Sequence, residues 1–342
     1  MISVDSTISK ISTVQEVFQQ IDPNILAQHI VDSFLPRAED YVDDIMLEEH
    51  ATLWENLPAT MKEMVYARVR KSAPRLIERL MEDIGEQIED LIDIKQMVTR
   101  QLVADKQLLN RIFLECGRQE FKFIVNSGLV FGFGFGLIQM ALWFFYPAPW
   151  VLPVCGFLVG WATNWIALNI IFRPLNPVNL GPLKVQGLFL KRQKEVAASF
   201  CKIVTHEVLT VGRIVNGMLN GPYSARTRAL VRKHVKPVVD ETAGISKPLT
   251  QIALGPKAFA DLKQKVGDKA ILISADTFNN PMFNKERAAT VEATMRERME
   301  AMSSAEFQNL LRPCFQEDEI KLIGIGGVLG ALAGFAQLVL VF

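Results

Sequence analysis

The sequence predicts a mostly α-helical integral membrane protein with three transmembrane helices and amphipathic helical regions outside the bilayer. Three stretches of roughly 20 residues contain no charged side chain, and that length spans a hydrocarbon core of about 30 Å. Outside these stretches, apolar residues recur at the three- and four-residue spacing of one helix face. Two of the stretches also share one glycine pattern, which predicts closely packed membrane helices.

The first two apolar stretches predict a transmembrane hairpin. One span covers about residues 123–146 and the next about residues 150–172, so only Pro147, Ala148 and Pro149 separate them. The predicted regions are an acidic helical region at 1–121, the hairpin at 122–172, a basic helical region at 173–320 and a C-terminal transmembrane helix at 321–342.

The short connection of the hairpin fixes the topology that we expect. Because the two spans form a hairpin, residues 1–121 and 173–320 share one side of the membrane. Basic residues lie next to the span ends on that side, whereas the hairpin tip has none. Loops rich in Lys and Arg stay on the cytoplasmic side of a membrane. Trp143, Tyr146 and Trp150 match an aromatic belt at the opposite surface. The two large regions are therefore expected in the cytoplasm.

The first and third spans carry a repeated glycine stripe. Glycines at a spacing of four lie on one helix face and let another helix approach closely. The two stripes run parallel, so we expect them to pack on each other or on a second copy of the chain. Each is followed by a glutamine that could donate across the contact. The predicted helix-packing residues are Gly128, Gly132, Gly136, Gln139, Gly326, Gly330, Gly334 and Gln337.

The second span contains polar side chains at Thr163, Asn164 and Asn169. An amide within the membrane needs a hydrogen-bond partner or water. Asn164 could tie the three helices together, or it could line a polar cavity. We favour the tie, because no ionisable residue lies within this span as ion pathways usually require.

The charges of the two large regions have opposite signs. Residues 1–120 hold 13 Lys and Arg against 22 Asp and Glu, while residues 173–320 hold 22 against 15. Basic residues beside a span attract anionic headgroups, which predicts headgroup binding by Arg173, Lys191, Arg192 and Lys194. Two alternatives are ordinary topology-setting charge and docking of the acidic region on the basic one, within or between subunits. Nucleic acid is not expected, because aromatic residues do not interleave with the basic ones.

Helical periodicity organises the cytoplasmic regions. Residues 74–93 carry apolar side chains on one helix face and charged side chains on the other, which predicts one long amphipathic helix. Asp93 and Asp105 are expected to cap the helices that follow them, and Ser303 with Glu306 forms a capping box. The one strand signal is a possible small β-hairpin at 178–185, with its turn at Gly181 and Pro182.

No pattern indicates an enzyme, a metal or a cofactor. The sequence contains no Walker loop, no GxSxG elbow and no CxxC pair. The four cysteines and four histidines are scattered without the spacing of metal ligands. We therefore expect a noncatalytic protein without a metal or another cofactor.

Two motifs resemble a known family. The first motif resembles the bacterial YheB and YjiN type membrane family, which is defined by a domain of unknown function. It consists of TNWIA at 163–167, FRP at 172–174, Gly187 with Leu188, and KRQ at 191–193. The glycine-rich run at 315–337 is similar to that family's terminal span, and the resemblance covers residues 155–342. The preceding part departs from the family, and residues 111–139 resemble a second copy of its C-terminal end. The resemblance implies a bacterial inner membrane location but no activity.

Two functions are compatible with these observations. The first is a noncatalytic homo-oligomeric assembly, or a platform that contacts anionic lipids on the cytoplasmic face. The alternative is an oligomeric transporter or channel for lipids or small solutes, with Thr163 and Asn164 along its path. Since three spans make a thin pathway, the second function also requires several subunits.

Overall fold

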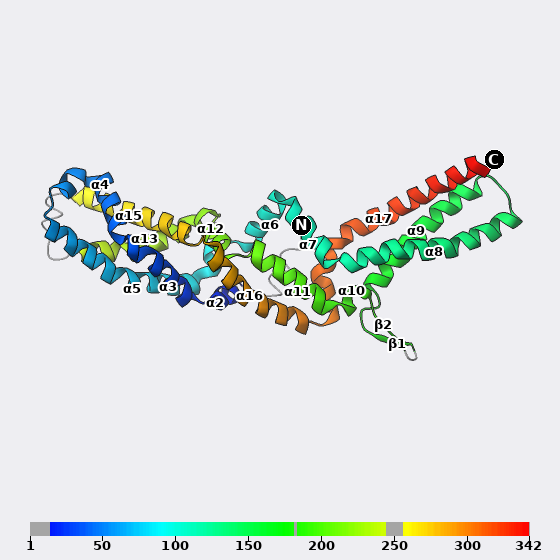
Figure 1. Cartoon of the computed structure of the whole chain (residues 1–342), viewed down its shortest axis with the longest axis horizontal. Helices are drawn as coiled ribbons and strands as arrows, with labels where there is room; N and C mark the ends of the chain where they lie inside the picture. The colour runs from blue at the N-terminus through cyan, green and yellow to red at the C-terminus, as the bar shows by residue number, and fades with distance from the viewer. Residues whose placement is uncertain (1–13, 181–182, 244–255, 342) are drawn as a thin grey trace. The chain divides into compact units, whose positions relative to one another are not determined.

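The computed structural model describes residues 14–180, 183–243 and 256–341, and these residues are almost entirely helical (Figure 1). Within these ranges the strands are β1 (Val178–Leu180) and β2 (Leu183–Val185), which pair antiparallel. The mostly α-helical class and the small hairpin are therefore confirmed. The turn predicted at Gly181 and Pro182 lies outside the described residues.

Contacts divide the described chain into two compact units. The membrane unit comprises residues 105–201 and 295–341, and the helical unit comprises residues 14–104 and 202–294. The helices of the membrane unit are α7 (Lys106–Cys116), α8 (Arg118–Phe145), α9 (Val151–Phe172), α10 (Leu188–Lys191), α11 (Gln193–Ile203) and α17 (Ser304–Val341).

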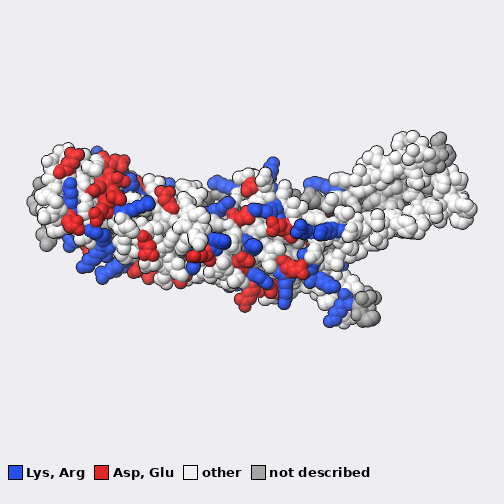
Figure 2. Space-filling view, viewed as in Figure 1, with Lys and Arg blue, Asp and Glu red and all other residues white. Residues whose placement is uncertain are grey.

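Three helices of the membrane unit are long and apolar enough to cross a bilayer, judged by length and composition. The candidate spans are Arg118–Phe145, Val151–Phe172 and Glu319–Leu340, so all three predicted spans are found. Their apolar side chains are largely exposed, with Phe145 at 83% and Leu340 at 87%. Figure 2 shows no charged side chain on the visible face of their outer parts. Lipid is the environment in which such a surface is stable.

An aromatic core lies beneath the spans of the membrane unit. Phe189 stacks on Phe307 and meets Phe172 at a tilt of 54°, with ring centroids 5.6 Å apart in both pairs. Phe189 and Phe307 are fully buried. The capping box forms as predicted, because the Ser303 amide donates to Glu306 and the Glu306 amide donates to the Ser303 hydroxyl. It starts α17, which runs without a break into the C-terminal span.

The helical unit is built around one long helix. Its helices are α2 (Val14–Ile21), α3 (Pro23–Phe34), α4 (Ala38–Glu55), α5 (Ala59–Leu91), α6 (Ile94–Ala104), α12 (Val211–Asn220), α13 (Ser224–Ala243), α15 (Pro256–Thr277) and α16 (Pro281–Ala301). Short η1 (Leu35–Arg37) and the π-helical η2 (Val204–Val208) complete it. The predicted apolar face of α5 packs against α2, α3 and α13. The predicted segment began at Pro74, but α5 begins 15 residues earlier at Ala59 and contains Pro74 in its interior. The helix is therefore longer than the segment that its periodicity predicts.

Caps join successive helices as the sequence indicates. The Gln96 amide donates to Asp93 at 2.8 Å, and the Leu108 amide donates to Asp105 at 2.9 Å. Each carboxylate satisfies a backbone donor that the first turn of a helix leaves unpaired.

Acidic and basic helices of the helical unit pair within one chain. Glu49 accepts from Lys265 at 2.9 Å, while Asp83 of α5 accepts from His234 at 2.8 Å and lies 3.3 Å from Lys233 of α13. The hydrogen bond from His234 lowers the pKa of Asp83. Because exposed pairs are worth about 1 kcal/mol or less, we assign them mainly to helix register. The contacts that the described residues make between the acidic and the basic region therefore lie within one chain.

Candidate functional site

The closest helix contact in the membrane unit joins α9 to α17 through glycines. The helices run antiparallel, and Gly156 and Gly160 of α9 face Gly330 and Gly326 of α17. A Cβ added at any of these four positions would overlap the backbone or the Asn164 side chain of the facing helix. In hydrocarbon, such close backbone contact supplies the van der Waals energy that holds helices together.

Two further residues, Gly334 and Asn164, extend this contact along the helices. Gly334 faces the backbone of Leu152, where an added Cβ would also overlap. At the other end, the Asn164 amide donates to the Leu322 carbonyl at 2.7 Å. The hydrogen bond satisfies part of the Asn164 amide within the membrane, as a tie between helices requires. The contact residues of α9 are therefore spaced by four positions, as Leu152, Gly156, Gly160 and Asn164.

The glycine stripe of α8 has a different environment. Gly128, Gly132 and Gly136 have no atom of the described residues within 4 Å of an added Cβ, apart from their own helix and immediate neighbours. The two stripes that the sequence predicts are thus not packed on each other within this chain. Gln139 is half-buried and Gln337 is exposed, and neither makes a hydrogen bond among the described residues. The α8 stripe is open along its length.

The remaining polar residues of the second span have local roles. Asn169 donates to the Trp165 carbonyl one turn earlier at 2.8 Å. Thr163 is 6% exposed, and its hydroxyl has no partner among the described residues. The apolar pocket described next is lined by none of Thr163, Asn164 and Asn169.

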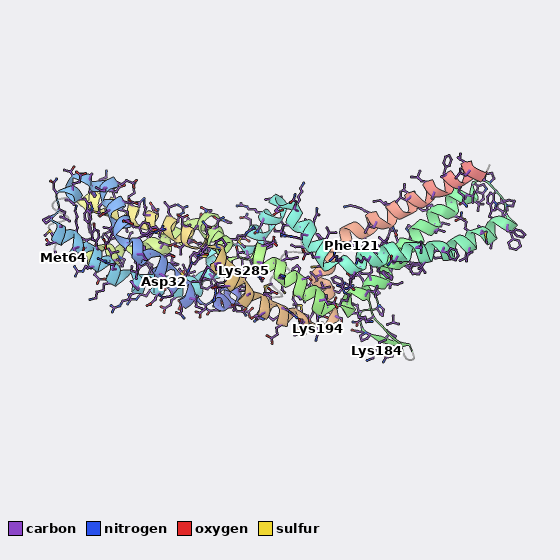
Figure 3. The ribbon with its side chains drawn as sticks, in the orientation of Figure 1. Asp32, Met64, Phe121, Lys184, Lys194 and Lys285 are labelled. Atoms are coloured by element: carbon purple, nitrogen blue, oxygen red, sulfur yellow. The ribbon has the colours of Figure 1, made fainter. Side chains whose placement is uncertain are left out.

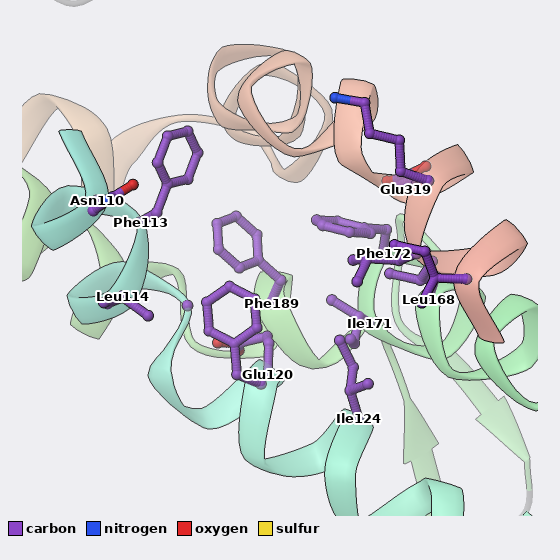
Figure 4. Close-up of a pocket in the computed structure, with 15 residues that line it drawn as sticks. Asn110, Phe113, Leu114, Glu120, Ile124, Leu168, Ile171, Phe172, Phe189 and Glu319 are labelled. Atoms are coloured by element: carbon purple, nitrogen blue, oxygen red, sulfur yellow. The ribbon is translucent and has the colours of Figure 1, made fainter. Parts of the chain in front are cut away.

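A mostly apolar pocket of about 470 Å³ lies where α7, α8, α9, α10 and α17 meet (Figure 4). Figure 4 shows Phe113, Phe189 and Ile171 lining it from three different helices. Its polar residues include Glu120 and Glu319. The apolar walls suit a hydrocarbon chain, and the charged residues that line the pocket are Glu120, Glu319 and Lys321. We call this cavity the junction pocket.

Glu120 forms a buried ion pair beside the junction pocket. Arg192 donates through Nη1 to both carboxylate oxygens of Glu120 at 2.8 and 2.9 Å, and through Nε to Glu195 at 2.9 Å. Glu120 is 6% exposed. Burial acts to lower the pKa of Arg192, but hydrogen bonds to Glu195 and Glu120 outweigh burial and raise it. The pair fixes α8 to the segment that begins α11.

The predicted headgroup residues thus fall into two groups. Arg173, Lys191 and Lys194 are exposed, and Lys194 is labelled in Figure 3. Arg192 is instead half-buried and engaged with two carboxylates. Sequence reasoning placed all four on the membrane surface because charge alone does not reveal a partner 72 positions away.

Sequence reasoning also missed the partner of the α17 stripe. Gly156 and Gly160 have the required four-residue spacing, and Asn164 continues it, so a search for small residues at that spacing on α9 would have found the contact. Within the described residues, no three His, Cys, Asp or Glu side chains are grouped as a metal site would need.

Comparison with known proteins finds a distant relative. The UPF0754 membrane protein of Shouchella clausii is 29% identical to this chain over 111 residues, which make up 31% of the chain and 29% of the relative. The chain therefore spans less than a third of that relative's length. No family model matches the chain, and no solved structure matches it. The similarity supports a membrane protein related to an uncharacterised family.

Proposed function

We propose that this is a noncatalytic bacterial inner-membrane protein of the YheB and YjiN type, which assembles with copies of itself and contacts anionic lipids on its cytoplasmic face. One observation supports assembly above the others. Of the two glycine stripes, α17 uses its stripe within the chain, whereas the stripe of α8 has no neighbour among the described residues.

The contrast between the stripes supports a second copy as the occupant. Lipid chains pack poorly against a flat backbone, and helix association in hydrocarbon gains most where small residues let backbones meet. Gly128, Gly132 and Gly136 present such a face over two helical turns. Copies that met through α8 would bury these glycines in the manner of the α9 contact with α17.

Lipid contact is the second part of the proposal. Arg173 and the exposed Lys191 and Lys194 lie near the end of the second span, where each basic residue attracts an anionic surface by about 1 kcal/mol. The cytoplasmic orientation rests on the same charges. The alternative, an oligomeric transporter, draws support from the apolar junction pocket of about 470 Å³. It loses support at Asn164, whose amide is engaged with Leu322.

Replacement of Gly132 by leucine tests the assembly. Gly132→Leu should lower the particle mass in mild detergent toward that of one 38.4 kDa chain. The matched control is Gly134→Leu, which adds the same side chain about 200° around the helix, also where nothing lies within 4 Å. The control should keep the wild-type mass. A wild-type protein that is already a single chain, or a Gly132→Leu variant of wild-type mass, would refute the proposal.

A further inference from the structure

The solvent face of α5 carries two runs of charge with opposite signs. Eight exposed charged side chains lie within about 100° of the helix circumference, opposite the apolar face that packs against α2, α3 and α13. We call the four cations the basic run and the four carboxylates the acidic run. The basic run is Arg68, Lys71, Arg75 and Arg79, and the acidic run is Glu78, Glu82, Glu86 and Glu89.

Neither run is neutralised within the described part of the chain. No side chain of the two runs makes an ion pair with another described residue. The neighbouring cations Arg226 and Lys233 of α13 pair instead with Asp90 and Asp83. Like charges three or four residues apart also repel on a helix, by about 0.2–0.5 kcal/mol per pair. Separation of the two signs therefore removes stability that alternating signs would supply to a single chain.

The two runs match when a second copy of α5 lies antiparallel to the first. A two-fold axis perpendicular to the helix, midway between positions 78 and 79, brings residues at equal distances from it to the same level. Each cation of the basic run then lies beside a carboxylate of the acidic run. The pairs are Arg68 with Glu89, Lys71 with Glu86, Arg75 with Glu82 and Arg79 with Glu78. The axis repeats each pair, so every charge of both runs meets its opposite.

We propose that two copies of this protein contact each other through the solvent faces of α5, antiparallel and in that register. A partner of one charge sign, such as an anionic membrane surface, would attract the basic run and repel the acidic run. A second copy in the reverse direction complements both runs. The inference rests on the proposed assembly of like chains and adds a contact in the helical unit to the α8 stripe. Since exposed ion pairs contribute about 1 kcal/mol or less each, the contact gains from copies that the membrane already holds together.

Cysteines at the outer ends of the two runs test the register. Two full-length chains, one with Arg68→Cys and one with Glu89→Cys, are co-expressed with tags of different size after their four native cysteines are replaced by alanine. Mild oxidation in native membranes should yield the heterodimer, because the axis places these positions side by side. Neither chain should form a homodimer, since two copies of position 89 lie about 32 Å apart along the paired helices, far beyond the limit of about 7 Å for a disulfide.

Charge reversal in the same pair of chains tests the electrostatic cause. Lys71→Glu with Arg75→Glu in the first chain should lower the heterodimer yield about tenfold, because like charges then face each other. Glu86→Lys with Glu82→Lys in the second chain should restore the yield. All four positions are exposed, so the fold tolerates the changes. The matched control in the first chain reverses two exposed cations of other helices and should leave the yield unchanged, as Lys257→Glu with Lys285→Glu.

The outcomes separate this inference from the proposed assembly. Absence of the heterodimer, homodimers of either chain in equal yield, or reversal without restoration would overturn the antiparallel contact. Absence of the heterodimer together with loss of bound phosphatidylglycerol in the Lys71→Glu, Arg75→Glu chain, measured by native mass spectrometry, would assign the basic run to lipid and also overturn it. A dimer of Gly132→Cys chains without the heterodimer would refute this inference alone, whereas absence of both would refute the assembly.

Discussion

The contact between α9 and α17 makes a quantitative prediction about Gly330. Alanine at this position would place its Cβ against the Gly156 carbonyl, within the van der Waals distance of the oxygen. Because the obstacle is backbone on both sides, no side-chain rotation can relieve it. The two helices must separate by roughly 1.4 Å, the deficit relative to an ordinary contact of about 3.5 Å.

The expected cost of Gly330→Ala follows from that separation. Overpacking of a close contact costs about 1–3 kcal/mol. Separation also stretches the 2.7 Å bond from Asn164 to Leu322, and such bonds in membranes contribute about 0.6 kcal/mol. Gly324→Ala is the control on the same helix, because nothing lies within 4 Å of its added Cβ. Any gain in helix propensity is common to both variants. The difference should therefore be about 2 kcal/mol.

Thermal unfolding in one detergent, followed by circular dichroism, measures this difference. At about 2–4 °C per kcal/mol, Gly330→Ala should melt about 5 °C below Gly324→Ala. Gly156→Ala should behave like Gly330→Ala, since it meets the same contact from the other helix. Equal melting temperatures for the Gly330 and Gly324 variants would show that the helices are not held by this backbone contact.

Two further predictions concern charged and phenolic groups. Glu120→Ala leaves the half-buried guanidinium of Arg192 with Glu195 as its remaining carboxylate partner, so the free energy of unfolding should fall by about 3 kcal/mol. Adding Arg192→Met to the same chain should recover part of that loss. Burial and the hydrogen bond to Asp43 raise the pKa of Tyr66 to about 12. The stability that this shift contributes is fully present below the tyrosine pKa of the unfolded chain, about 10, and is lost as the pH rises toward 12. Tyr66→Phe should therefore make the melting temperature fall less steeply at alkaline pH.

The sequence was sufficient for the fold class because its signals are local. Runs without charge predict the spans, and Ser303 with Glu306 predicts the start of α17, since both depend on residues a few positions apart. The β-hairpin at 178–185 was likewise visible in one short segment.

The partners across the fold were not predictable in the same way. Four-residue spacing identifies a smooth face but not the helix that occupies it, so α17 was paired with α8 or a second copy rather than with Gly156 and Gly160. Arg192 looked like a surface cation because Glu120 lies far from it in sequence.

Disulfide formation across the open face of α8 tests the proposed assembly most directly. In a chain whose four native cysteines are replaced by alanine, Gly132→Cys should form a cross-linked dimer under mild oxidation in native membranes. Cysteines bridge only when their Cα atoms lie within about 7 Å. Gly134→Cys, on the other side of the helix, should stay monomeric on a non-reducing gel. A monomer at position 132, or equal cross-linking at both positions, would contradict assembly through the α8 stripe.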